Sequence, residues 1–277
     1  MGDAMTVHEA AVRLLEAARN DDEGFGPRPG APSEPEPTAL AAVALDDARA
    51  REWLVAHQRD DGSFGLVDGF VRDEAATGLA AIALDEGEAR ERALDRLESL
   101  EGQRVVSDAA IPLDGDLAGW PWTLDTFGWV DPTARALLAL RLLRPGSDRI
   151  ADGIALLRDR SSVGGGWNYG NRVVLGEELP PFAHTTAIAL LGLHGLDAEL
   201  EAEATARLRE LWRAERAGGI SLALSLAVFR LGGDEDEAAA VDAALTDVVV
   251  GSGLLDDAVV AAWCAIVTRP GLERLSG

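Results

Sequence analysis

The sequence predicts an all-α protein built from about six pairs of helices. Three observations indicate this class. A short apolar segment that opens with threonine recurs along the chain, and an amphipathic segment precedes most copies of it. The alternation of apolar and polar residues that is typical of strands is not found. The pattern spans the chain, so we expect a single domain over residues 1–277.

The apolar segments predict an inner layer of helices. Threonine begins four copies, and alanine, leucine and isoleucine follow it. A helix that is apolar on nearly all sides is buried on all sides. The four clear copies and then the two weaker ones occupy residues 38–45, 77–84, 133–140, 186–193, 221–228 and 257–264.

The amphipathic segments predict an outer layer, because they carry charged residues, mostly arginine and glutamate, on one side. They occupy residues 8–19, 49–58, 90–100, 150–160, 203–213 and 237–248. Apolar helices inside and amphipathic helices outside give two packed layers. Six such pairs can close into a ring, an α/α toroid, or stack as an open solenoid. Short inner helices rich in alanine fit a tight ring, so we expect the toroid, although the pattern alone does not decide.

A turn with glycine and an aromatic residue joins outer to inner helices in the first four pairs. Glycine permits the positive φ that ends a helix, and the aromatic side chain can pack between neighbouring repeats. These turns lie at residues 21–26, 58–65, 119–122 and 164–170.

The composition is strongly acidic. Asp and Glu number 48 against 25 basic residues, all of them arginine, which gives a net charge of −23. Such a chain is repelled by nucleic acid and by anionic membranes, so we exclude both as general partners. Because the acids are spread along the chain, we favour a surface adapted to high salt over a local patch for a basic partner. The single cysteine, Cys264, excludes an internal disulfide. No signal peptide or membrane span is evident, so we expect a cytoplasmic protein.

The turn motif resembles that of a known superfamily. A polar-faced helix, the run Gln58-Arg-Asp-Asp-Gly-Ser-Phe-Gly65 and a Thr-Ala helix resemble the repeat of squalene–hopene cyclases and protein prenyltransferase β-subunits. Gly119-Trp120 and residues 164–167 match the glycine and aromatic part of the motif without its glutamine. The resemblance to this terpenoid cyclase and protein prenyltransferase superfamily implies an α/α toroid. Its central apolar cavity would handle isoprenoid chains.

Each chemistry of the superfamily has a diagnostic motif. The Asp-x-Asp-Asp acid of the cyclases is not present, and the nearest acidic runs, residues 234–237 and 256–257, are expected at helix starts. The prenyltransferases resembled here hold zinc with Asp-x-Cys and a later Tyr-His-Thr. Asp131 and His184 match these motifs, but Thr133 replaces the cysteine, and threonine is a poor zinc ligand. We therefore predict no metal site with the present residues, and zinc only if another side chain completes it.

Asp131 and His184 are the candidate catalytic residues. Asp131 precedes Pro132 and also fits a helix cap, whereas His184 is the best acid or base candidate because histidine titrates near neutrality. The resemblance implies a cation for a diphosphate, for which Arg72, Arg135 and Arg172 are candidates. The predicted substrate-binding wall, which can instead be packing between repeats, consists of Trp120, Trp122, Trp129, Trp167 and Tyr169. Insertions at residues 103–117 and 171–181 lengthen these two repeats, and we expect the site between them.

Three functions stay open from the sequence. The first is a protein that binds or transforms an isoprenoid or another apolar ligand in a central cavity. The second is a non-catalytic binding or scaffold toroid that has lost the catalytic motifs. The third is a toroid that acts on carbohydrate, which requires a pair of carboxylates in the cavity. The sequence identifies no protein partner.

Overall fold

The computed structural model describes residues 5–66, 74–107, 112–215, 218–252, 255–268 and 272–275. Helices dominate these residues, which confirms the predicted all-α class. The inner helices are α2 (Pro35–Leu45), α4 (Ala76–Ala83), α6 (Val130–Leu143), α8 (Ala183–Leu193), α10 (Gly219–Leu231) and α12 (Ala258–Thr268). The outer helices are α1 (Val7–Ala18), α3 (Ala48–His57), α5 (Glu88–Ser99), α7 (Arg149–Arg160), α9 (Ala198–Ala214) and α11 (Glu235–Thr246).

The two layers follow from the two kinds of helix. Nearly every residue of α8 is buried, from Ala183 to Leu193, whereas the outer helix α5 buries only Ala93, Leu94 and Leu97. Burying the apolar stripe of each outer helix against an inner helix removes both apolar surfaces from water. The predicted inner and outer helices therefore lie in the layers that their hydrophobic patterns indicate.

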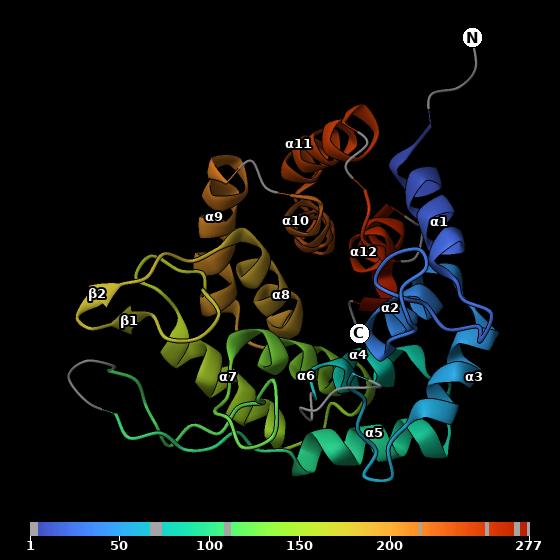
Figure 1. Ribbon diagram of the computed structural model, residues 1–277. Helices are drawn as coiled ribbons and strands as arrows, with labels where there is room; N and C mark the ends of the chain where they lie inside the picture. Colours follow the sequence, from blue (N-terminus) through green and yellow to red (C-terminus); the bar gives the residue numbers. More distant parts are fainter. Residues whose placement is uncertain are drawn as a thin grey trace.

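The inner helices contact one another in a closed cycle. Each packs against the next from α2 to α12, and α12 packs against α2 (Figure 1). The outer helices α3, α5, α7, α9 and α11 each pack on the inner helix that precedes them in the chain. The first helix, α1, packs instead on the last inner helix, α12, so the two ends of the chain complete the outer layer together.

Glycine allows the backbones of neighbouring inner helices to approach closely. A Cβ added at Gly78 of α4 would lie 2.7 Å from the carbonyl oxygen of Arg135 in α6. A Cβ at Gly192 of α8 would lie 2.6 Å from the carbonyl oxygen of Ala134. Real Cβ atoms do not approach carbonyl oxygens this closely, so a larger side chain at either position would push two inner helices apart.

The threonine that opens each clear repeat holds the turn before it. The backbone N–H of Phe25 donates to Thr38 Oγ1 at 2.9 Å, and that of Phe64 donates to Thr77 Oγ1 at 3.0 Å. The third and fourth repeats make the same bond, from Trp120 to Thr133 and from Trp167 to Thr186, both at 3.0 Å. The recurring threonine and the recurring aromatic residue are thus two halves of one hydrogen-bonded unit, buried where water cannot replace it.

Gln58 of the turn motif connects successive repeats. Its Nε2 donates to the carbonyl of Gly62 at 3.1 Å and to that of Ala89, at the start of α5, at 2.8 Å. Its Oε1 accepts from the guanidinium of Arg92, also in α5. The glutamine therefore fixes its own turn and anchors the following outer helix.

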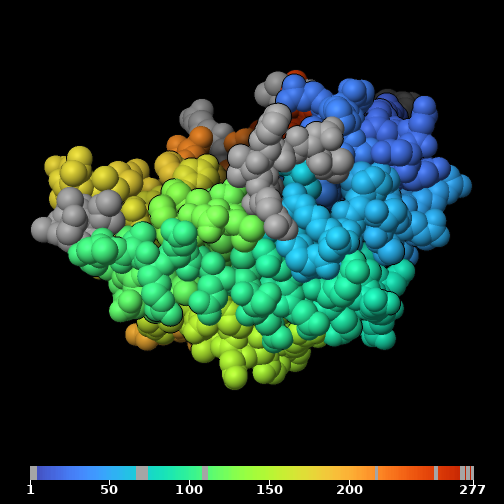
Figure 2. Space-filling model, turned by 60° about the horizontal axis from the view of Figure 1, so that its bottom comes forward, coloured from blue at the N-terminus to red at the C-terminus, as the bar shows by residue number. Residues whose placement is uncertain are grey.

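A short hairpin interrupts the helical pattern. Strands β1 (Val173–Val174) and β2 (Glu177–Glu178) pair in antiparallel fashion within the insertion between α7 and α8, where no strand was predicted. Two residues per strand are too few to give an alternating signal. Figure 2 shows the α5–α6 connection (green) on one face of the molecule, with the segment of the hairpin (yellow) at its edge. None of the helices in the described ranges is both long and apolar enough to cross a membrane.

Candidate functional site

The site is built around the first turns of three inner helices. Glu36, Asp131 and His184 are each the second residue of their helix, in α2, α6 and α8 respectively. Each also lies two residues before the repeated threonine of its segment. The same position of the repeat is therefore polar in repeats one, three and four, and the cycle of inner helices brings these polar groups to the same end of the ring.

Arg135 forms ion pairs with both carboxylates of this set, Glu36 and Asp131. Its Nη1 lies 2.6 Å from Glu36 Oε1, and its Nε donates to Asp131 Oδ1. Because α4 lies between α2 and α6 in the cycle, the pair with Glu36 connects two inner helices that are separated by a third. The side chain of Arg135 is 14% exposed and that of Asp131 is 10% exposed. Both carboxylates raise the pKa of the Arg135 guanidinium against the opposing effect of its burial.

Asp131 does not cap α6 as predicted. Helix α6 begins at Val130 after Trp129, and no side chain caps it. Asp131 lies inside the first turn, and its carboxylate is taken up by Arg135 one turn later. The Asp131 carboxylate therefore accepts a charge-assisted hydrogen bond from Arg135 within its own helix.

The surroundings of His184 favour the neutral form of its imidazole. Burial lowers its pKa below the ordinary value of 6.5, the charge of Arg135 lowers it further, and the charge of Asp131 opposes both. A neutral imidazole offers one donor and one acceptor nitrogen to a ligand. Glu215, at the end of α9, accepts from the backbone N–H of Ala183 at 2.9 Å, and burial raises the pKa of its carboxyl.

Aromatic rings surround the polar groups. The ring centroid of Tyr169 lies 5.2 Å from that of His184 and 5.7 Å from that of Phe182. The guanidinium carbon of Arg135 lies 5.5 Å from the ring centroid of Trp122, within the range of a cation–π contact. Tyr169 is 46% exposed, so its ring presents apolar surface beside His184.

The structure separates the five predicted wall residues into three groups. Trp122 and Tyr169 lie at the site. Trp129 stacks on Phe127 at 4.5 Å and packs against the backbone of Gly170. The other two rings lie in the core. Trp120 is 1% exposed and Trp167 is not exposed at all, and their indole N–H groups donate to the carbonyls of Leu97 and Leu157 at 2.8 and 2.7 Å respectively. Those two rings pack between repeats and present no surface to a ligand.

The residues around Asp131 do not fit a zinc ion. Thr133, which stands where the resembled enzymes have cysteine, is fully buried, and its hydroxyl accepts from the backbone of Trp120. Asp131 is engaged by Arg135. In the part of the chain that the structure describes, no three His, Cys, Asp or Glu side chains lie close enough together to hold a metal.

The arginines that were predicted to bind a diphosphate do not form a common site. Arg135 is paired with two carboxylates, which with a neutral His184 leave the cluster at a net charge of −1. Arg172 lies before the hairpin, where its charge acts on Arg160. Arg72 lies outside the described residues. An anionic diphosphate would therefore meet a negative cluster at this end of the ring.

Glu36 is the site residue that the sequence analysis missed. It stands between Pro35 and Pro37, at the end of a proline-rich stretch that is typical of an extended loop, whereas α2 begins at Pro35. Aligning the repeats on their threonines places Glu36 level with Asp131 and His184, and this alignment is the signal that would have identified it.

The chain matches no family model and no curated protein. Among solved structures it is similar to a protein from Actinoplanes known from its crystal structure. The TM-score is 0.60 and the identity is 15%, over 98% of this chain and 99% of that one. At this identity the likeness shows the fold alone.

Proposed function

We propose that the protein binds a neutral isoprenoid, such as a polyprenyl alcohol, at the end of the ring where Asp131, Arg135 and His184 lie. The closed cycle of inner helices supports an α/α toroid, with these side chains at the start of its inner helices α6 and α8. The observation that carries the proposal is the combination of a closed ion-pair cluster, a neutral histidine and a partly exposed aromatic surface.

The chemistry of the cluster favours binding over protonation of an alkene. A cyclisation that begins with protonation needs an acid aimed at the substrate, whereas the Asp131 carboxylate is taken up by Arg135. The neutral imidazole of His184 can hydrogen-bond a hydroxyl group. Trp122, Tyr169 and Phe182 supply apolar surface for the attached chain. The negative cluster favours the alcohol over its diphosphate.

A thermal-shift assay in high KCl tests the proposal. The ligands are farnesol, geranylgeraniol, squalene and farnesyl diphosphate. A ligand that binds only the folded state stabilises it by about 2.7 kcal/mol at 100 times its dissociation constant. We expect farnesol or geranylgeraniol to raise the melting temperature, and farnesyl diphosphate to raise it less.

Two variants locate the effect. Tyr169→Ala removes a ring that is 46% exposed, so it should reduce the ligand shift with little change in the melting temperature of the free protein. Leu175→Ala, at a hairpin residue that is 79% exposed, is the matched control and should keep the full shift. No shift with any neutral isoprenoid, in a protein that melts cooperatively, would refute the proposal and favour a scaffold toroid.

A further inference from the structure

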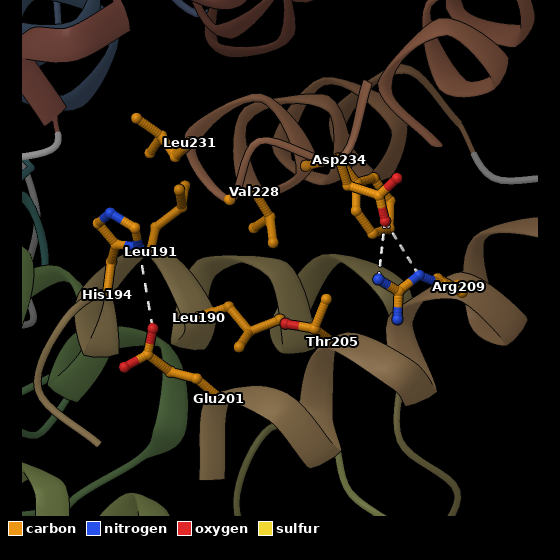
Figure 3. Close-up of a pocket in the computed structure, with 11 residues that line it drawn as sticks. Leu190, Leu191, His194, Glu201, Thr205, Arg209, Val228, Leu231 and Asp234 are labelled. Atoms are coloured by element: carbon orange, nitrogen blue, oxygen red, sulfur yellow. Dashed lines mark hydrogen bonds and ion pairs between the residues drawn. The ribbon is translucent and has the colours of Figure 1, made fainter. Parts of the chain in front are cut away.

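A cavity lies at the end of α8 opposite to His184. It has a volume of about 160 Å³ and lies between α8, α9 and α10 (Figure 3). His184 is near the start of α8 and His194 directly follows its end, about 15 Å away for a separation of ten residues at 1.5 Å per residue. An engineered cavity of about 150 Å³ is large enough to bind benzene. This cavity is therefore distinct from the isoprenoid site and large enough for a small molecule.

The walls combine an apolar centre with polar ends. Leu190, Thr205 and Val228 lie between two polar pairs in Figure 3. At one end Arg209 donates through Nε and Nη2 to Asp234 Oδ2, at 3.2 and 2.7 Å, so this pair is closed. The other end is formed by His194 and Glu201.

Glu201 is a carboxylate fixed in place. Its Oε2 accepts from the backbone N–H of Gly195 and its Oε1 from that of Asp197, both at 3.1 Å. His194 Nδ1 lies 3.8 Å from Glu201 Oε2, which is too long for a hydrogen bond. Arg141 also interacts with the charge of Glu201, but its guanidinium donates to the carbonyls of Leu191 and Leu275. Each oxygen of Glu201 keeps a lone pair for another donor.

The side chain that lines the cavity at His194 is shorter than its counterpart in the preceding repeat. His194 lies eight residues after Thr186, and Arg141 lies eight residues after Thr133. Arg141 is 8% exposed and buries a long side chain, whereas the shorter side chain of His194 is 30% exposed. The shorter His194 side chain lines the cavity instead of filling it.

We propose that this cavity binds a small organic cation. Its ammonium group would donate to Glu201, and an apolar body about the size of a benzene ring would lie against Leu190 and Val228. The closed Arg209–Asp234 pair adds no net charge, so the fixed carboxylate of Glu201 sets the preference for a cation.

Titrations with three probes of one shape test the charge preference. Benzylammonium, benzyl alcohol and benzoate are added to the full chain, and the backbone amide signals of His194 and Thr205 are followed by NMR. We expect benzylammonium to bind at least ~10-fold more tightly than the alcohol, which is about 1.4 kcal/mol, and benzoate not to bind. Equal affinity of the alcohol, or no saturable shift with millimolar benzylammonium, would overturn the proposal.

Variants test the location. Glu201→Gln should weaken benzylammonium at least ~10-fold. Glu203→Gln, on the exposed side of the same helix, removes the same charge and should leave the affinity within about 2-fold, since surface charges contribute little. Because Glu201 also supports the turn after α8, Val228→Phe provides a second variant that fills the cavity without touching the carboxylate. Unchanged binding in Val228→Phe would show that the cation binds elsewhere and would refute the assignment.

Discussion

Replacing Thr77 by valine tests the hydrogen bond that organises the repeat. Thr77 Oγ1 accepts from the backbone N–H of Phe64 at 3.0 Å and lies 3.3 Å from its carbonyl oxygen, and both residues are fully buried. Valine has nearly the same shape, so no cavity forms, but the N–H loses its partner. An unsatisfied buried polar group costs ~1–3 kcal/mol, and the weaker contact to the carbonyl adds to this, so we expect a loss of about 2–3 kcal/mol.

Urea unfolding followed by circular dichroism measures this loss. A lower midpoint with an unchanged dependence on urea indicates a change in stability alone. The control is Thr246→Val, at an exposed residue of α11 whose hydroxyl donates only to the Asp242 carbonyl of its own helix. It should change the free energy of unfolding by less than about 0.5 kcal/mol. If both variants lose the same free energy of unfolding, the hydrogen bond between the threonine and the aromatic residue does not organise the repeat.

Three further predictions concern the ring and its site. Gly192→Ala should destabilise the protein by about 1–3 kcal/mol in urea unfolding, because its Cβ would meet the Ala134 carbonyl, whereas Gly146→Ala has open space and should cost under about 1 kcal/mol. Arg135→Met should cost about 3 kcal/mol in the same assay, because it leaves two carboxylates without their partner, and a loss below ~1 kcal/mol would contradict the buried cluster. The unfolded chain protonates His184 more readily than the folded one, so acidification from about pH 7.5 to about pH 5.5 should lower the free energy of unfolding. His184→Gln should show a smaller decrease, and an equal decrease would contradict the lowered pKa.

The helices were predictable because their pattern is local and repeated. The expected segment 186–193 lies within α8, and even the weak copy at 257–264 marks α12. The choice between the expected toroid and an open solenoid was not decided by the pattern, because the packing of α1 against α12 joins the two ends of the chain and leaves no local signal. The periodicity of a helix predicts which of its faces is buried, but it does not predict which other helix packs against that face.

The site was predictable in part for the same reason. Asp131 and His184 were predicted from the resemblance to the prenyltransferase motifs, and in the structure both lie at inner-helix starts, where their charges interact with Arg135. Trp120 and Trp167 were not separable from Trp122, because an aromatic residue after glycine fits a ligand wall and a packing contact equally well. Only the partners of the indole N–H groups, which come from distant helices, distinguish the two roles.

The central claim is that a neutral isoprenoid binds beside His184, and histidine NMR tests it most directly. The chain has four histidines, so the ring signals of His8, His57 and His194 serve as internal controls at other places in the fold. On addition of farnesol, the account predicts a saturable shift of the His184 ring signals, which His184→Gln assigns, with the other three unmoved. Signals of His184 that stay in place while farnesol binds, or that respond only to farnesyl diphosphate, would contradict it.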